Sequence, residues 1–261
     1  MTSERTSAPG DIVFVHGMYM NAASWLPWVG RAEDRGYQCH AVSWPYHDGP
    51  PAELRAKPAP ALGSLTFGEV VDHYKSFIAE LPRRPIVIGH SIGGLITQKL
   101  VNDGYASAGV VISSAPPQGV VSFDPNFFRA NFPHVNPFAG NRPVIMTPSR
   151  FHYAFANTLS RQASDAGFEA YVVPESRNVP RSTLTKQARI EFKTDHVPLL
   201  FMTGDSDHLT PLAMVRANSA RYAPSTGLLE FTEFPNRSHF ICNEPGWEDV
   251  ADHAFEWLAR L

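Results

Sequence analysis

The ten residues from Pro85 to Gly94 read PIVIGHSIGG and join an apolar run to a glycine-rich turn. The run IVI is typical of a buried strand, and the following LITQKLV predicts a helix. Because glycine has no Cβ, Gly89 and Gly93 would let the strand and the helix approach closely. The stretch therefore predicts a sharp strand-to-helix turn with Ser91 at its apex.

Further apolar runs along the chain are also typical of strands. They lie at residues 12–17, 37–44, 108–116, 197–205 and 228–235. Helical periodicity lies between them, most clearly at residues 70–81 and 247–258, and Thr210 with Pro211 predicts a helix start. Runs that are apolar on both faces suit a parallel sheet covered by helices. We therefore expect an α/β fold, with a mostly parallel sheet of about six strands flanked by helices.

One long segment interrupts this alternation. Residues 117–193 contain no clear strand of the sheet and are rich in Phe and Pro. They could form a hydrophobic cluster under long loops. We favour a helical cap over a site, because long insertions in compact domains are often lids. The expected organisation is a core domain of residues 1–116 and 194–261 with a cap or lid at 117–193.

Composition limits the classes of function. The 261 residues are 43% hydrophobic and 18% charged, which is ordinary for a globular protein. A net charge of −3 offers no field to hold a nucleic acid. No apolar run approaches the roughly 20 residues of a membrane helix, and MTSERTSAPG lacks the apolar part of a signal peptide. We expect a cytoplasmic protein with no nucleic-acid or membrane partner; the sequence is silent on its oligomeric state.

The residues from Gly89 to Gly93 match the pattern G-x-S-x-G. The bare pattern is weak evidence, but its place between a predicted strand and a predicted helix strengthens it. Such a turn projects the serine from the carboxyl edge of a sheet. A serine hydroxyl is a weak nucleophile that needs a histidine base, and the base needs a carboxylate. In folds of this kind the chain order is serine, acid, histidine.

Partners for Ser91 occur in that order. Asp205 and Asp207 follow one predicted strand, and His239 follows the last one. The carboxyl ends of parallel strands lie at one edge of the sheet, so these loops can meet. Asp205 is an alternative acid, but it directly follows the strand and could close the turn. We favour Ser91 as nucleophile, His239 as base and Asp207 as the orienting acid.

Acyl transfer also needs donors for an oxyanion. One should be the amide of Ile92, and the second should come from the loop after the first strand. In that loop we favour Met18, with Tyr19 as the alternative. Residues expected to contact the substrate are Tyr19, Trp25, Phe123, Phe127, Phe128 and Leu209. No H-x-x-x-H or C-x-x-C spacing predicts a metal site, and we expect no cofactor.

These pieces together resemble the α/β-hydrolase superfamily. The matching stretches are VHGMYMNAASW, VIGHSIGGL, GDSDHLTP and NRSHF. The resemblance implies a cap inserted after the strand at 108–116 and a Ser-Asp-His triad. The chain looks most like the compact branch that includes plant-type methylesterases and hydroxynitrile lyases. Two departures matter: Ser91 stands where haloalkane dehalogenases carry Asp, and Gly17 and Phe240 stand where the lyases carry Thr and Lys.

The sequence thus predicts a cofactor-independent serine hydrolase. It would cleave a carboxylic ester or lactone of a small to medium apolar or aromatic substrate through an acyl-enzyme. The same triad could instead serve thioester or amide hydrolysis, acyl transfer, perhydrolysis or C–C bond cleavage. A ligand-binding receptor with little turnover is a further alternative, because a fold does not by itself define a function.

Overall fold

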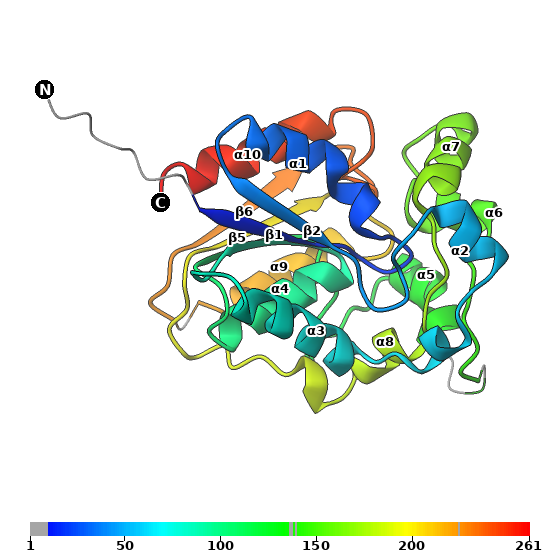
Figure 1. The fold of residues 1–261 in the computed structure, drawn as a ribbon, viewed down its shortest axis with the longest axis horizontal. Coiled ribbons are helices and arrows are strands. Elements are labelled where there is room, and N and C mark those ends of the chain that lie inside the picture. Colours follow the sequence, from blue (N-terminus) through cyan, green and yellow to red (C-terminus); the bar gives the residue numbers. More distant parts are fainter. Residues whose placement is uncertain (1–9, 136–137, 139, 224) are drawn as a thin grey trace, which may run out of the picture.

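The protein is built on a six-stranded sheet in the order β2-β1-β3-β4-β5-β6 (Figure 1). The computed structural model describes residues 10–135, 138, 140–223 and 225–261, and it describes no side chains at 132–135. The strands are Asp11–Val15 (β1), Gln38–Val42 (β2), Ile86–His90 (β3), Ala108–Ile112 (β4), Leu199–Gly204 (β5) and Leu229–Phe234 (β6). All neighbouring strands pair in parallel. The predicted α/β fold with about six parallel strands is therefore confirmed.

Helices cover both faces of this sheet (Figure 1). One face carries α1 (Leu26–Glu33) and α10 (Trp247–Leu258), and the other carries α3 (Phe67–Ala79), α4 (Ile92–Asn102) and α9 (Leu212–Ala220). Along β1, Ile12 and Phe14 belong to one core cluster, while Val13 and Val15 belong to the other. Successive side chains of a strand point to opposite faces, so a continuous apolar run supplies both cores.

Shorter helices fill the connections before the third strand. They are η1 (Ala22–Trp25), α2 (Pro51–Ala56) and η2 (Pro60–Ser64). A capping box fixes the start of α3, because the side chains of Thr66 and Glu69 each bind the other's backbone N–H. Within the described ranges, no helix is both long enough and apolar enough to cross a membrane.

The chain leaves the sheet between β4 and β5. This inserted segment contains α5 (Pro125–Val135), α6 (Pro148–Ala154), α7 (Arg161–Tyr171), α8 (Asn178–Ser182) and η4 (Lys186–Ala188). In its described part, the only β-pairing is an isolated antiparallel bridge between Val144 and Glu175. Figure 1 shows these helices, in green to yellow, gathered at the end of the sheet where β1 stops. The insertion therefore lies beside the loops that follow the strands.

The turn between β3 and α4 is packed without spare room. A Cβ added at Gly89 would lie 2.2 Å from the carbonyl oxygen of Gly93, and one added at Gly93 would lie 2.1 Å from that of Val15. Both positions therefore exclude any side chain, because the nearest atom in each case belongs to the backbone. The helix start thus rests directly on the end of the neighbouring strand β1.

We predict that Gly93→Ala lowers the free energy of unfolding by about 1–3 kcal/mol or more, the cost of overpacking a filled core. The added methyl group would meet the carbonyl oxygens of Val15 and His16, at 2.1 and 2.6 Å. Urea unfolding followed by circular dichroism measures the change. Gly30→Ala is the control, because a Cβ there has no atom within 4 Å. Equal stability of Gly93→Ala and wild type would contradict this close packing.

Candidate active site

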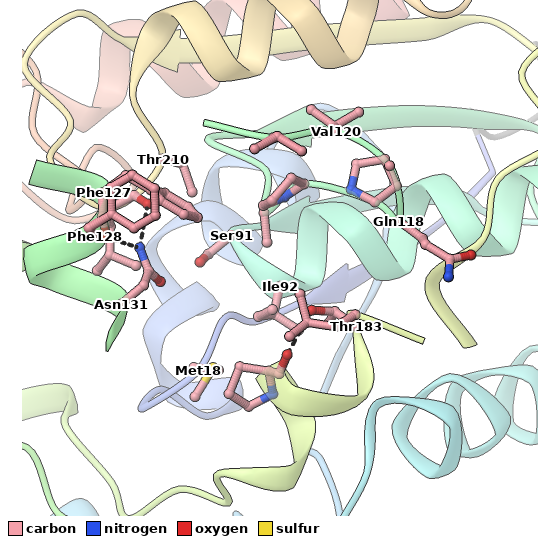
Figure 2. A pocket seen from close by; sticks show the side chains of 18 of the residues that line it. Met18, Ser91, Ile92, Gln118, Val120, Phe127, Phe128, Asn131, Thr183 and Thr210 are labelled. Atoms are coloured by element: carbon pink, nitrogen blue, oxygen red, sulfur yellow. Dashed lines mark hydrogen bonds between the residues drawn. The ribbon is translucent and has the colours of Figure 1, made fainter. Parts of the chain in front are cut away.

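Ser91 lies at the turn between β3 and α4, at the carboxyl edge of the sheet. Its backbone has φ 58° and ψ −121°, a left-handed region that non-glycine residues seldom adopt. Three hydrogen bonds hold it there: its N–H donates to the carbonyl of Ile112 at 2.9 Å, and its carbonyl accepts from the N–H groups of Ala115 and Leu95 at 3.0 and 3.2 Å. Figure 2 shows its hydroxyl among the side chains that line a cavity.

Asp207 and His239 form a buried pair beside this turn. The Nδ1–H of His239 donates to Oδ2 of Asp207 at 2.7 Å. The other oxygen, Oδ1, accepts from the N–H groups of Leu209 and Thr210 at 2.7 and 2.8 Å. Burial raises the pKa of Asp207, but His239 and these hydrogen bonds outweigh it and lower the pKa below its usual value. The carboxylate is therefore an ionised acceptor that orients the imidazole.

Thr210 belongs to this pair rather than to a helix. Its Oγ1 lies 2.8 Å from Oδ2 of Asp207 and 3.0 Å from the carbonyl oxygen of Ser113. The helix α9 begins later than predicted, at Leu212, with Pro211 at the capping position. The sequence suggested a capping threonine, but its hydroxyl is used by the buried aspartate instead.

The two ring nitrogens of His239 differ: Nδ1 is hydrogen-bonded to Asp207, and Nε2 has no hydrogen-bond partner among the described residues. Nδ1 carries the hydrogen bonded to Asp207, so Nε2 of the neutral ring is unprotonated. Within the described part of the chain, Nε2 is buried and has no hydrogen-bond partner. The ring of Phe155 packs edge-on against the imidazole, 5.0 Å between centroids. This arrangement leaves Nε2 as an available proton acceptor.

His90 fixes the backbone of His239. Its Nε2–H donates to the carbonyl oxygen of His239 at 2.8 Å, and the two rings are 4.6 Å apart. Burial, together with the neighbouring His239, lowers the pKa of His90 to about 3. His90 is therefore a neutral donor at ordinary pH, and it ties the residue before Ser91 to the loop after β6.

The other acidic and histidine side chains nearby have structural contacts. Oδ1 of Asp205 accepts from the N–H of Asn236 at 2.8 Å and closes a turn, away from His239. The Nδ1–H of His208 donates to the carbonyl of Tyr153 at 2.9 Å. In the part of the chain that the structure describes, no three His, Cys, Asp or Glu side chains are grouped as metal ligands.

Met18 and Ile92 line the cavity together with Ser91. Ile92 is the first residue of α4, where helix amides have no partner within the helix. Met18 follows His16 and Gly17 after β1, and no hydrogen bond between described residues occupies its amide. The amide of Tyr19, the alternative donor, is engaged because it donates to Oε2 of Glu175 at 3.2 Å. The geometry thus favours Met18 over Tyr19 as a donor toward the cavity.

The cavity has a volume of about 360 Å³ and mostly apolar walls (Figure 2). It is lined from the loop after β1, the start of α4, the inserted segment and the loop after β5. Among the residues predicted to contact a substrate, the structure places four in its wall: Tyr19, Phe127, Phe128 and Leu209. A volume above about 300 Å³ is in the range of small-molecule sites.

Trp25 and Phe123, which were also expected to contact a substrate, do not line this cavity. The ring of Trp25 is buried against Phe14 and Trp28, at centroid distances of 5.2 and 5.3 Å, in the core under α1. Phe123 is 88% exposed just before α5. The residue types were suitable, but the direction of each side chain was decided by packing.

Glu175 is a buried residue near the site that no sequence pattern indicated. Its contact with Tyr19 joins residues 156 positions apart in the chain. The sequence pattern assigns Thr210 to a helix cap, not to a contact with Asp207. No local signal distinguishes either role, because each depends on which loops meet at the edge of the sheet.

Comparison with known proteins agrees with this architecture. Residues 12–253 match the alpha/beta hydrolase family. A pimeloyl-[acyl-carrier protein] methyl ester esterase from Vibrio atlanticus (strain LGP32) is 28% identical over 127 residues. That match covers 48% of this chain and 44% of the esterase, so it spans less than half of the relative.

Solved structures share the fold over nearly the whole chain. A monoacylglycerol lipase from Paleococcus ferrophilus has a TM-score of 0.70 at 20% identity, covering 97% of this chain and 95% of the lipase. A methylesterase from Arabidopsis has a TM-score of 0.68 at 14% identity, covering 96% and 99%. Taken with the parallel sheet and the serine at its strand-to-helix turn, these matches confirm the predicted resemblance: the chain belongs to the alpha/beta hydrolase family.

Proposed function

We propose that this protein is a serine hydrolase that cleaves carboxylic esters or lactones through an acyl-enzyme intermediate. The observation that carries the proposal is the 2.7 Å bond from His239 to Asp207, which leaves Nε2 of His239 unpartnered beside the serine turn. The relative from Vibrio atlanticus is a methyl ester esterase, and the similar structures are a lipase and a methylesterase. These names support an ester as the substrate.

In the first step, Oγ of Ser91 attacks the ester carbonyl carbon and Nε2 of His239 takes its proton. Asp207 stabilises the imidazolium that forms. The carbonyl oxygen becomes an oxyanion and accepts hydrogen bonds from the amides of Met18 and Ile92. Each such donor typically stabilises the transition state by about 2.7–4 kcal/mol.

In the second half, His239 returns its proton to the leaving alcohol oxygen as the C–O bond breaks. The acyl group is then bonded to Ser91. A water molecule gives a proton to Nε2 of His239 and attacks the acyl carbon, and the acid leaves as Ser91 regains its proton. These steps use the chain's own residues and require no cofactor.

The cavity wall supports a small to medium apolar or aromatic substrate. Phe127 and Phe128 come from the inserted segment, while Leu209 comes from the core. Residues 117–193 would thus act as the cap on a core of residues 1–116 and 194–261. Apolar walls favour apolar acyl or alcohol groups, since burying each CH₂ contributes about 0.8 kcal/mol.

We predict that Ser91→Ala lowers kcat for p-nitrophenyl butyrate by about 10³-fold or more, because no acyl-enzyme can form. Steady-state release of p-nitrophenol measures the loss. Ser76→Ala is the matched control, since Ser76 is exposed and its hydroxyl donates to the carbonyl of Asp72 within the same helix. Wild-type turnover by Ser91→Ala would refute the proposed function.

A second prediction concerns two phenylalanines close in sequence. Phe127→Ala is expected to raise KM for p-nitrophenyl hexanoate about tenfold, which corresponds to 1.4 kcal/mol of lost apolar contact. Phe123→Ala should leave KM unchanged, because Phe123 is 88% exposed outside the cavity. Equal effects of the two substitutions would show that the substrate does not occupy this cavity.

A further inference from the structure

Glu175 is a fully buried carboxylate in the inserted segment that binds the loop after β1. Its Oε2 accepts from the N–H of Tyr19 and from Nε2–H of His47, both at 3.2 Å. Its Oε1 accepts from the N–H of Ser176 at 2.6 Å. Glu175 and His47 are both 0% exposed. Three hydrogen-bond partners compensate the burial of this carboxyl group, since burying such a group is costly unless it is paired.

His47 is the basic side chain paired with this carboxyl group. Its Nδ1 lies 3.0 Å from the carbonyl oxygen of Pro45, and its Nε2 lies 3.2 Å from Oε2 of Glu175. Both ring nitrogens face oxygen atoms that can accept, an arrangement that favours the doubly protonated imidazolium. Burial lowers the pKa of His47, but the charge and hydrogen bond of Glu175 outweigh it, and the pKa is raised. The raised pKa of His47 favours an ion pair between the two side chains.

The loop residue that this pair contacts has an unusual backbone. Tyr19 has φ 64°, in the left-handed region, which costs a bulky residue about 1–3 kcal/mol. The inserted segment binds both of its backbone groups: the N–H donates to Glu175, and the carbonyl accepts from the N–H of Val173 at 2.9 Å. Glu175 is itself fixed by two backbone hydrogen bonds to Val144, each 2.8 Å. The insertion therefore sets the conformation of this loop.

We propose that Glu175 is a positioning residue that keeps the amide of Met18 directed at the oxyanion. It does so by holding the peptide between Met18 and Tyr19, which adjoins the peptide carrying the Met18 N–H. The ion pair with His47 keeps uncompensated negative charge away from the developing oxyanion. This inference rests on the proposed function and adds that the insertion helps to assemble the site as well as cover it.

Two conservative variants separate the effect of the side-chain length at position 175 from the effect of its charge. Glu175→Gln keeps an oxygen at the same reach for the N–H of Tyr19 but gives up the charge. Glu175→Asp keeps the charge but withdraws the oxygens by one methylene. If Glu175 acts by position, kcat for p-nitrophenyl butyrate stays within about threefold in Glu175→Gln. In Glu175→Asp it falls about 10- to 100-fold with KM little changed, as expected for a small misplacement of a catalytic group.

Stability should respond in the opposite order. Glu175→Gln loses the ion pair and should have the lower melting temperature of the two, whereas Glu175→Asp loses more kcat.

Inhibition by a trifluoromethyl ketone, which places an oxyanion on the Ser91 adduct, should weaken in parallel with kcat. Glu169→Gln is the control, because this exposed carboxylate of the same segment binds Arg55 at the surface. Wild-type kcat in Glu175→Asp, or an equal loss in Glu175→Gln, would overturn the proposal.

One readout does not depend on turnover. The amide of Tyr19 should exchange slowly with solvent in the wild type and in Glu175→Gln, and faster in Glu175→Asp. Equal protection in all three would refute the positioning role. If the wild type shows no Ser91-dependent ester hydrolysis, the proposed function fails, and the amide exchange still decides whether Glu175 holds the loop.

Discussion

The structure depends on how closely the turn after β3 approaches the end of β1. No Cβ fits at Gly93, because it would lie 2.1 Å from the carbonyl oxygen of Val15, and one at Gly17 would lie 2.9 Å from Cβ of Ser91. The serine turn and the loop after β1 are therefore in direct contact. This contact brings Met18 and Ile92 to the same cavity as Ser91.

Buried hydrogen bonds also hold the side chains and the loop that surround the turn at Ser91. Asp207 is held by two backbone amides and holds His239, while His90 binds the carbonyl of His239. On the other side, Glu175 and His47 hold the loop at Tyr19. Polar groups in a dry interior specify a geometry sharply, because each unsatisfied group is costly. The site is thus supported by the core on one side and by the insertion on the other.

Much of this could be predicted from local patterns. Continuous apolar runs indicated the six strands, because strands buried on both faces need apolar residues at every position. The order of Ser91, Asp207 and His239 along the chain indicated loops that share one edge of a parallel sheet. The directions of the Trp25 and Phe123 side chains are harder to predict, since an aromatic residue near a site can face the cavity, the core or the solvent. Trp25 faces the core and Phe123 faces the solvent.

The sequence by itself determined the parallel sheet, the sharp turn at Ser91 and the alpha/beta hydrolase family, because these follow from periodicity and motifs read within short stretches. The tertiary structure decided which aromatic residues wall the cavity, that Thr210 serves Asp207 instead of capping a helix, and that Glu175 binds the amide of Tyr19. Those outcomes depend on contacts between distant segments. Glu175 and Tyr19 are 156 residues apart, and only the packing of the insertion against the sheet edge brings them together.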